Sequence, residues 1–273
     1  MMQPASRAAL AAARERLESR ISTASAVERE RLGDDLSAVA AVLVRQPVIR
    51  RHLADAAAPE GARRAMLDTL FGGKIGQLGL LVLGDVVNSR WSAPRDLVGG
   101  LEELAWQSQL ALADRDGVLD DIEDELFRFG RILAAQPRLG SLLGDETAPA
   151  EGRVALLNRV LAGRASPVTR RLLEHAVRMP RRRGIDEIIG TLVDRAAARR
   201  ERSVAYVTAA GPLSVAQERR LVDLLDRIYQ RPISLKISFD PALLGGLVIR
   251  VGDELIDGSV AARLGQARQW MSR

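Results

Sequence analysis

The sequence predicts a mainly α-helical protein that ends in a small α+β domain. An internal repeat runs through about the first 200 of the 273 residues, and its apolar positions recur at helical spacing. About the last 70 residues instead alternate apolar and polar positions, as half-buried strands do. We therefore expect two tandem helical-bundle copies, residues 1–110 and 111–200, followed at 201–273 by a small mixed sheet with two helices.

The repeat has a period of 90 residues. Gln46-Pro47 aligns with Gln136-Pro137, and Ala58-Pro59 aligns with Ala148-Pro149. Further residues are identical to the residue 90 positions later: Asp34, Leu36, Leu43, Leu53, Asp55, Arg63, Ala65, Leu67, Gly73, Leu83 and Val87. A one-residue slip near Arg182 extends the alignment. A register held over about 60 residues indicates a duplicated helical module.

Each copy of the repeat is predicted to be a run of short amphipathic helices. Residues 5–22 are expected to form the first helix of the first copy. Residues 101–112 close the first copy, open the second, or do both as one continuous helix. In the second copy, one apolar stripe is made by Ile122, Leu126, Phe129 and Leu133. Pro137 ends that helix and Pro149 opens the next, at the first-turn position that tolerates proline.

The C-terminal domain is expected to begin near Arg202. Residues 204–208 alternate as a strand, and Ser214 with Gln217 has the spacing of a capping box at the start of a helix. That helix ends at Pro232, and residues 233–239 alternate as the next strand.

A hairpin and a last helix are predicted at the end of the chain. Leu247–Val251 and Glu254–Asp257 are the two strands, joined by a tight Gly252-Asp253 connection. Gly258 stops the second strand, and Ser259 is placed to cap a helix with apolar residues at helical spacing. These apolar residues are Val260, Leu264, Ala267 and Met271.

The side chains do not form the clusters that catalysis or metal binding requires. There is no cysteine, and the two histidines, His52 and His175, occupy non-equivalent repeat positions without a metal-binding spacing. Gly245-Gly246 precedes a strand rather than a helix, so it does not indicate a phosphate loop. The acidic group of Asp253, Glu254 and Asp257 lacks the alternating ligands of a calcium loop. We expect no catalytic residue, no metal site and no cofactor.

The high content of arginine leaves one alternative, a basic helical protein that binds nucleic acid. The isoelectric point is near 10.5, and Arg178, Arg181, Arg182 and Arg183 form a dense cluster. Against this, the net charge is only +5, acidic residues are spread among the basic ones, and aromatic residues for base stacking are few. A second rival, an enzyme, would have to work through carboxylates alone.

No segment is expected to enter a membrane. The longest apolar run, Leu78–Leu83, is far shorter than the roughly 20 residues that span a bilayer. The N-terminus lacks the basic-then-apolar order of a secretory signal.

The C-terminal motifs, taken in order, resemble those of the delta-subunit family of the F-type ATP synthase, the oligomycin-sensitivity-conferring protein family. Residues 204–214 (VAYVTAAGPLS) are similar to the family's entry strand and helix start, and residues 240–252 (DPALLGGLVIRVG) to its diagnostic block. Five residues carry the family's structural signature: Gly245, Gly246, Gly252, Asp257 and Gly258.

The resemblance implies a non-catalytic peripheral-stalk subunit. Its partners would be the alpha subunits of the catalytic head, through their N-terminal segments, and the b-type stalk subunits, with no nucleic acid. It would resist rotational torque at the cytoplasmic face of the cell membrane, held there through the complex. The family has one helical bundle, whereas this chain has two copies, as actinobacterial members with an enlarged helical region do. The second copy adjoins the C-terminal domain and is the closer equivalent of the usual bundle.

Overall fold

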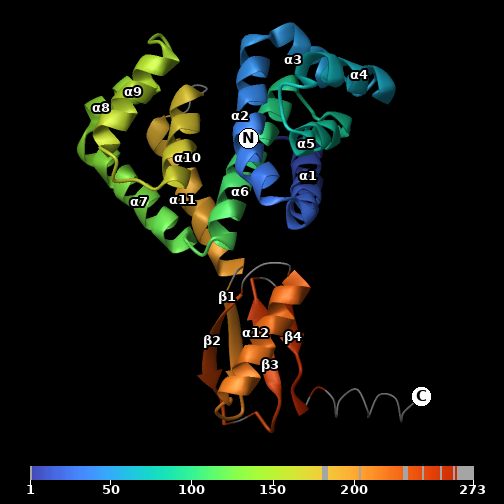
Figure 1. The fold of residues 1–273 in the computed structure, drawn as a ribbon, viewed down its shortest axis with the longest axis vertical. Coiled ribbons are helices and arrows are strands. Elements are labelled where there is room, and N and C mark those ends of the chain that lie inside the picture. The colour runs from blue at the N-terminus through green and yellow to red at the C-terminus, as the bar shows by residue number, and fades with distance from the viewer. Residues whose placement is uncertain are drawn as a thin grey trace. The chain divides into compact units, whose positions relative to one another are not determined.

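The fold, taken from a computed structural model, is mainly helical with a small four-stranded sheet near the C-terminus (Figure 1). The structure describes residues 2–179, 184–202, 204–229, 233–241, 243–252, 254–260 and 262. These residues confirm the predicted fold class. The chain divides into two compact units, Met1–Ala113 with Asp121–Arg195, and Asp114–Asp120 with Ala196–Arg273.

Eleven helices precede the sheet in the described part of the chain. They are α1 (Pro4–Thr23), α2 (Ala26–Arg45), α3 (Pro47–Leu53), α4 (Glu60–Phe71), α5 (Gln77–Asn88), α6 (Pro94–Arg115), α7 (Leu119–Ala135), α8 (Pro137–Gly144), α9 (Ala150–Leu161), α10 (Pro167–Arg178) and α11 (Ile185–Arg202). Several begin at proline, which has no N–H to leave unbonded in the first turn.

The 90-residue repeat predicted from the sequence is confirmed in the helices. The bounds of α4 and α5, shifted by 90 residues, are those of α9 and α10. Gln46 and Gln136 precede α3 and α8 with similar backbone angles, φ −119° and −131°. Asp55 and Asp145 shape the same turn, because each Oδ1 accepts a hydrogen bond of 2.9 Å from the backbone N–H two residues later.

The helix α6 belongs to both copies of the repeat. Shifted by 90 residues, α1 falls on the first 20 residues of α6, and both helices begin at a proline, Pro4 and Pro94. With the one-residue slip, α6 in turn aligns with α11. Of the three predicted alternatives, the structure therefore shows that residues 101–112 lie in one continuous helix that closes the first copy and opens the second.

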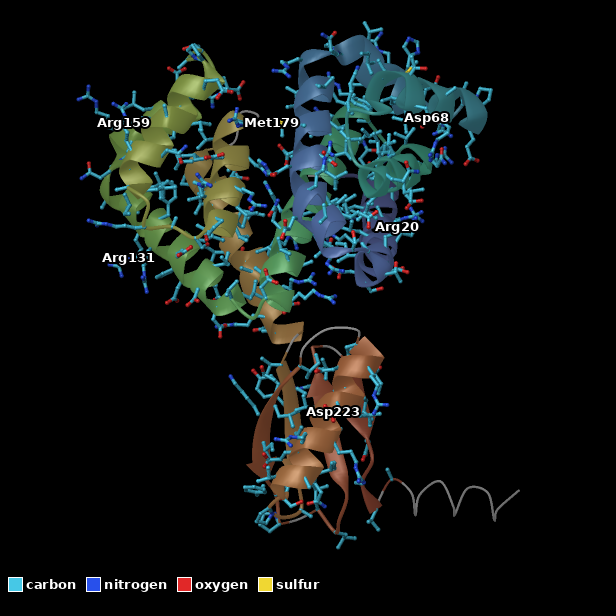
Figure 2. All side chains as sticks on the ribbon, viewed as in Figure 1. Arg20, Asp68, Arg131, Arg159, Met179 and Asp223 are labelled. Atoms are coloured by element: carbon cyan, nitrogen blue, oxygen red, sulfur yellow. The ribbon has the colours of Figure 1, made fainter. Side chains whose placement is uncertain are left out.

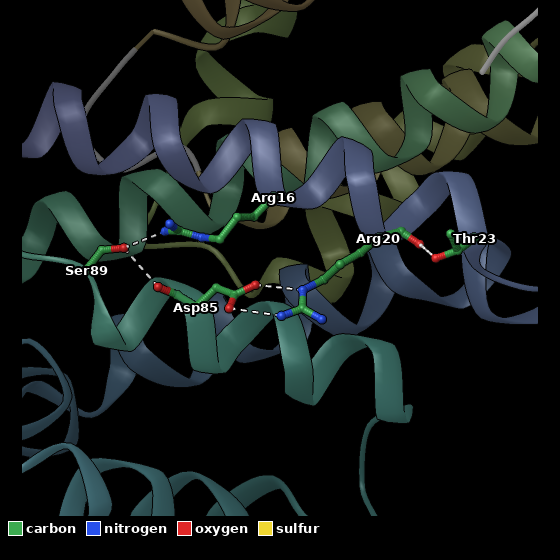
Figure 3. Close-up of polar contacts among 5 residues, drawn as sticks. All are labelled: Arg16, Arg20, Thr23, Asp85 and Ser89. Carbon is green, nitrogen blue, oxygen red and sulfur yellow. Dashed lines mark hydrogen bonds and ion pairs between the residues drawn. The ribbon is translucent and has the colours of Figure 1, made fainter. Parts of the chain in front are cut away.

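Polar contacts join α1 to α5 at the surface of the first copy (Figure 3). The Arg20 guanidinium donates to both carboxylate oxygens of Asp85, at 2.7 and 3.0 Å. One turn earlier, Arg16 donates to the Ser89 hydroxyl at 3.0 Å. A bidentate pair of this kind is geometrically specific, so it fixes the register of the two helices. Beneath it lies an apolar core that includes Leu17, Leu36 and Leu83.

The second unit contains β1 (Val204–Ala209), α12 (Val215–Tyr229), β2 (Ser234–Phe239), β3 (Leu247–Val251) and β4 (Glu254–Asp257). The strand order is β2-β1-β3-β4, with β1 parallel to β2 and antiparallel to β3. The core between α12 and one face of the sheet includes Ala205, Val207, Leu221, Leu225 and Ile249. Side chains on this face come from alternate strand positions, as the sequence predicted.

The capping box predicted at the start of α12 is confirmed. The backbone N–H of Gln217 donates to the Ser214 hydroxyl at 3.3 Å, and the Ser214 N–H donates back to the Gln217 side chain at 2.8 Å. Two donors at the helix start are thereby satisfied.

Two sequence interpretations fall outside the described residues. They are the arginine cluster at Arg181, Arg182 and Arg183, and the part of the last helix that follows Ala262. Within the described residues, the helices include none with the length and apolar character needed to cross a membrane.

Candidate subunit interface

Four of the five signature residues meet where the β3–β4 hairpin begins and ends. The Gly258 N–H donates to the Leu247 carbonyl at 2.9 Å, and the Val260 N–H donates to the Gly245 carbonyl at 2.9 Å. These bonds hold the segment that leaves β4 against the segment that enters β3. Gly252 lies at the other end of the hairpin, in the turn between the strands.

Close approach and backbone conformation together require glycine at this junction. Gly245 and Gly246 have φ angles of +146° and +85°, and a Cβ atom added to Gly246 would lie 2.4 Å from the Gly258 carbonyl oxygen. An L-amino acid with a side chain rarely adopts such a φ and could not fit the space. Gly252, with φ +57°, supplies the left-handed residue of the turn, which confirms the predicted tight hairpin.

Asp257 and Ser259 shape the exit from the hairpin. The Asp257 carboxylate accepts a 2.9 Å hydrogen bond from the backbone N–H of Ser259, and this bond, with the one that the Ser259 hydroxyl donates, lowers the pKa of Asp257. The Ser259 hydroxyl in turn accepts from the Ala262 N–H at 3.2 Å. The cap predicted at Ser259 is therefore confirmed.

A groove opens beside the first turns of α12, with a volume of about 450 Å³. Its lining is largely apolar and comes from the loop after β1, from α12 and from the start of β3. The lining residues that define it are Pro212, Leu213, Arg220, Leu221, Leu224 and Leu247. A concave apolar surface with a few polar groups is typical of a binding site for a helix or a small apolar group.

The exposed side of α12 continues this apolar surface. Leu221 and Leu225 face the sheet, whereas Leu224 and Ile228, one turn apart, are 46% and 54% exposed. The spacing of these leucine and isoleucine positions indicates two stripes, because residues 221 and 225 and residues 224 and 228 form two separate i, i+4 pairs. Only the first stripe is buried against the sheet.

The opposite face of the sheet carries a basic row centred on Tyr206. In the strand register Tyr206 pairs with Lys236 of β2 and with Arg250 of β3. The Lys236 Nζ lies 5.6 Å and the Arg250 guanidinium 4.6 Å from the centre of the Tyr206 ring. Both cations lie at distances favourable for interaction with the aromatic ring. The two faces of this unit therefore differ, one apolar beside α12 and one basic.

None of these features forms a catalytic constellation, and the described residues contain no group of three or more His, Cys, Asp or Glu side chains suited to a metal ion.

Comparison with known proteins decides the family. The sequence model described as ATP synthase delta (OSCP) subunit matches residues 107–271. The ATP synthase subunit delta of Streptomyces griseus is 44% identical over 271 residues, which is 99% of this chain and 100% of that protein. The chain belongs to the ATP synthase delta (OSCP) family.

Other similarities give the same result or add no weight. The ATP synthase subunit delta of Streptomyces avermitilis is 45% identical over 268 residues, covering 98% of both chains. A chain from the cryo-EM structure of the Toxoplasma gondii mitochondrial ATP synthase hexamer shares 19% identity, with a TM-score of 0.31, and the match covers 62% of this chain and 95% of that one. The latter likeness is too weak to support any argument.

The delta-family match begins inside α6, at residue 107. It includes the second helical copy and the C-terminal sheet, whereas residues 1–106 lie before it. The Streptomyces relatives are matched along almost their entire length, so they share the longer N-terminal part.

His175 contributes to the contacts between the part matched by the delta-family model and the part that precedes it. His175 of α10 lies between two residues of α2, with Nε2 3.1 Å from Asp34 Oδ1 and Nδ1 2.9 Å from Ser37 Oγ. A carboxylate can only accept, so Nε2 carries the hydrogen, and in the neutral ring Nδ1 accepts from the Ser37 hydroxyl. This hydrogen bond holds the pKa of Asp34 below its ordinary value. Ser37 is only 7% exposed, which closes it to a substrate and leaves a contact between helices.

Proposed function

We propose that this chain is the delta subunit of an F-type ATP synthase, a structural rather than catalytic part of its peripheral stalk. The observation that carries the proposal is 44% identity to a subunit of that name along 99% of the chain. The alternative of nucleic-acid binding has no support from the family assignment.

The second helical copy is the part we assign to the catalytic head. In this proposal it binds the N-terminal segments of the alpha subunits. We choose this copy because the family match starts at residue 107 and so includes the second copy and not the first. The signature glycines have a structural task, which is to close the β3–β4 hairpin of the C-terminal domain tightly enough to bear load.

The C-terminal domain, residues 201–273, is the part we assign to the b-type stalk. Support comes from the groove beside α12, which Leu224 lines, and from the exposed Ile228 next to it. An amphipathic helix in such a groove would bury these side chains, and buried apolar anchors supply most of the affinity of an interface. The chain would then hold the head against the torque of rotation, at the cytoplasmic face of the membrane.

A binding assay with purified subunits tests the proposal. Leu224→Asp should abolish capture of the b-type subunit while capture of the catalytic head through alpha is retained. Val215→Asp is the matched control, because Val215 is exposed on the same helix but outside the groove, and it should bind b normally. Unchanged b binding by Leu224→Asp, or tight saturable ATP binding by the isolated chain, would contradict the proposal.

A further inference from the structure

The contact between the two helical copies shows what one face of α2 can bind. Asp34 and Ser37 on α2 hold His175, and one turn earlier the Arg171 guanidinium donates to the Glu30 carbonyl at 3.5 Å. Residue numbers rise in the same direction along both helices, so α10 lies parallel to α2 at this contact.

The helix that occupies this face is amphipathic and basic. Its apolar side chains, which include Leu172 and Val177, are buried within the second copy. Its polar positions include Arg170, Arg171, His175 and Arg178, against one acidic residue, Glu174. An acidic face on α2 is thus matched with a basic helix, which is the charge complementarity that selects partners at interfaces.

The repeat places an equivalent face on α7. Residues 34 and 37 of α2 correspond to Asp124 and Phe127 of α7, since the two helices align with a shift of 90 residues. Ser37 is buried by α10, whereas Phe127 is 54% exposed. The N-terminal half of α7 is also more acidic, with Asp121 exposed beside Asp124.

The same face of α7 becomes basic after Phe127. Arg131, one turn beyond it, points away from the bundle in Figure 2. Asp124 pairs with Arg128 of the same helix, and the side chains of this pair are both about 70% exposed. Such a solvated pair contributes little and can be exchanged for a partner's charges.

We infer that the α7 face, formed by Asp121, Asp124, Phe127 and Arg131, binds a basic amphipathic helix of another subunit of the complex. The helix lies parallel to α7, as α10 lies on α2, with basic residues beside Asp121 and Asp124 and an apolar side chain on Phe127. A large aromatic side chain in the middle of a polar surface is typical of an interface anchor. The inference rests on the proposed function, since it takes the partner from the ATP synthase.

Photocrosslinking in the assembled enzyme tests the inference. p-Benzoylphenylalanine is placed at residue 127 or, as a control, at residue 48, where Val48 is an exposed apolar residue of α3. ATP synthase is purified from each strain and irradiated, and the crosslinked peptides are sequenced. Residue 127 should capture a helical segment of another subunit with basic residues ahead of its apolar positions, and residue 48 should not.

Retention of the chain in the complex provides a second readout. Phe127→Ala and Asp124→Lys should leave the thermal unfolding of the free chain unchanged, because both side chains are exposed. Both should increase its rate of dissociation from the purified enzyme by roughly tenfold, whereas Val48→Ala should not. Equal retention of all variants, or a crosslink only to an acidic or non-helical segment, would overturn the inference. Absence of the parent chain from the enzyme would instead refute the proposed function.

Discussion

Arg63 and Arg153 make the same hydrogen bond in the two copies of the repeat. Each donates through Nη1 to the backbone carbonyl of the valine 24 residues later, Val87 for Arg63, at 2.5 Å, and Val177 for Arg153. Both arginines are buried, so each guanidinium exchanges water for a backbone carbonyl oxygen near the C-terminal end of the following helix. A cation at the C-terminal end of a helix is also favoured by the helix dipole.

Replacement of either arginine should destabilise its own copy. Arg153→Met removes the donor to two buried carbonyls, of Val177 and Leu143, and should cost about 1–3 kcal/mol in the free energy of unfolding. Arg63→Met should have a similar effect in the first copy. Urea denaturation followed by circular dichroism measures both, with Arg159→Met, an exposed residue of α9 labelled in Figure 2, as the control. Equal midpoints for Arg153→Met and Arg159→Met would show that the buried bonds do not stabilise the fold.

Substitution of Asp34 should weaken the contact between the copies in a pH-dependent way. The pKa of Asp34 is lowered by the hydrogen bond from His175, so the ionised carboxylate is the form that stabilises the fold. That stabilisation is fully present above the ordinary pKa near 3.8 and is lost as the pH falls through the lowered value. Because Asp34 is half exposed, Asp34→Asn should cost only about 0.5–1 kcal/mol at neutral pH.

Urea denaturation of Asp34→Asn at a series of pH values measures this effect. The difference from the parent chain should shrink below about pH 4. His175→Gln should remove most of the effect of Asp34→Asn in a double-mutant cycle, because the two side chains act as a pair. A difference that stays constant down to pH 3 would rule out this ionisation as the cause.

A side chain at Gly246 should loosen the sheet. Gly246→Ala meets both an unfavourable φ of +85° and a contact of 2.4 Å with the Gly258 carbonyl, so it should cost more than about 1 kcal/mol. Gly190→Ala in α11 is the opposite case, with open space around the added methyl, and should be neutral or stabilising. Amide hydrogen exchange of β3 should accelerate at least about tenfold in the first variant only.

A methyl group at Gly100 should displace Trp91. A Cβ atom on Gly100 would lie 2.4 Å from Cη2 of the Trp91 ring, whose N–H donates to the Val86 carbonyl at 2.7 Å. Gly100→Ala should therefore destabilise the first copy by roughly 1–3 kcal/mol, despite the better helix propensity of alanine. Added to a Trp91→Phe background, the same change should cost less, because the smaller ring leaves room. Thermal unfolding of the four variants measures the coupling.

The helices were predictable where identical residues in the two copies supported each other. Pro47 and Pro137, or Arg63 and Arg153, occupy equivalent positions, and the structure gives them equivalent roles. The hairpin was predictable for a different reason. Apolar and polar residues alternate before and after Gly252, and this pattern on both sides of a tight turn favours two paired strands.

The contacts at the candidate interfaces were not predictable in the same way. The sequence does not predict the contact of His175, because its partners Asp34 and Ser37 lie about 140 residues away and only tertiary packing brings them together. The groove beside α12 was missed because its lining comes from three separate segments. Phe127 was not singled out, since a phenylalanine in an amphipathic helix is most often part of the core.

Because α6 ends one copy and begins the other, the second copy requires fewer new helices than a separate bundle would. A bundle of six helices becomes two bundles by the addition of five helices and 90 residues, not six helices. Neither copy can be removed with all of its helices without also removing α6 from the other copy. Unfolding of α6 would thus destabilise both copies at once. A force applied to one copy would be transmitted to the other through the continuous helix α6 rather than through a flexible linker.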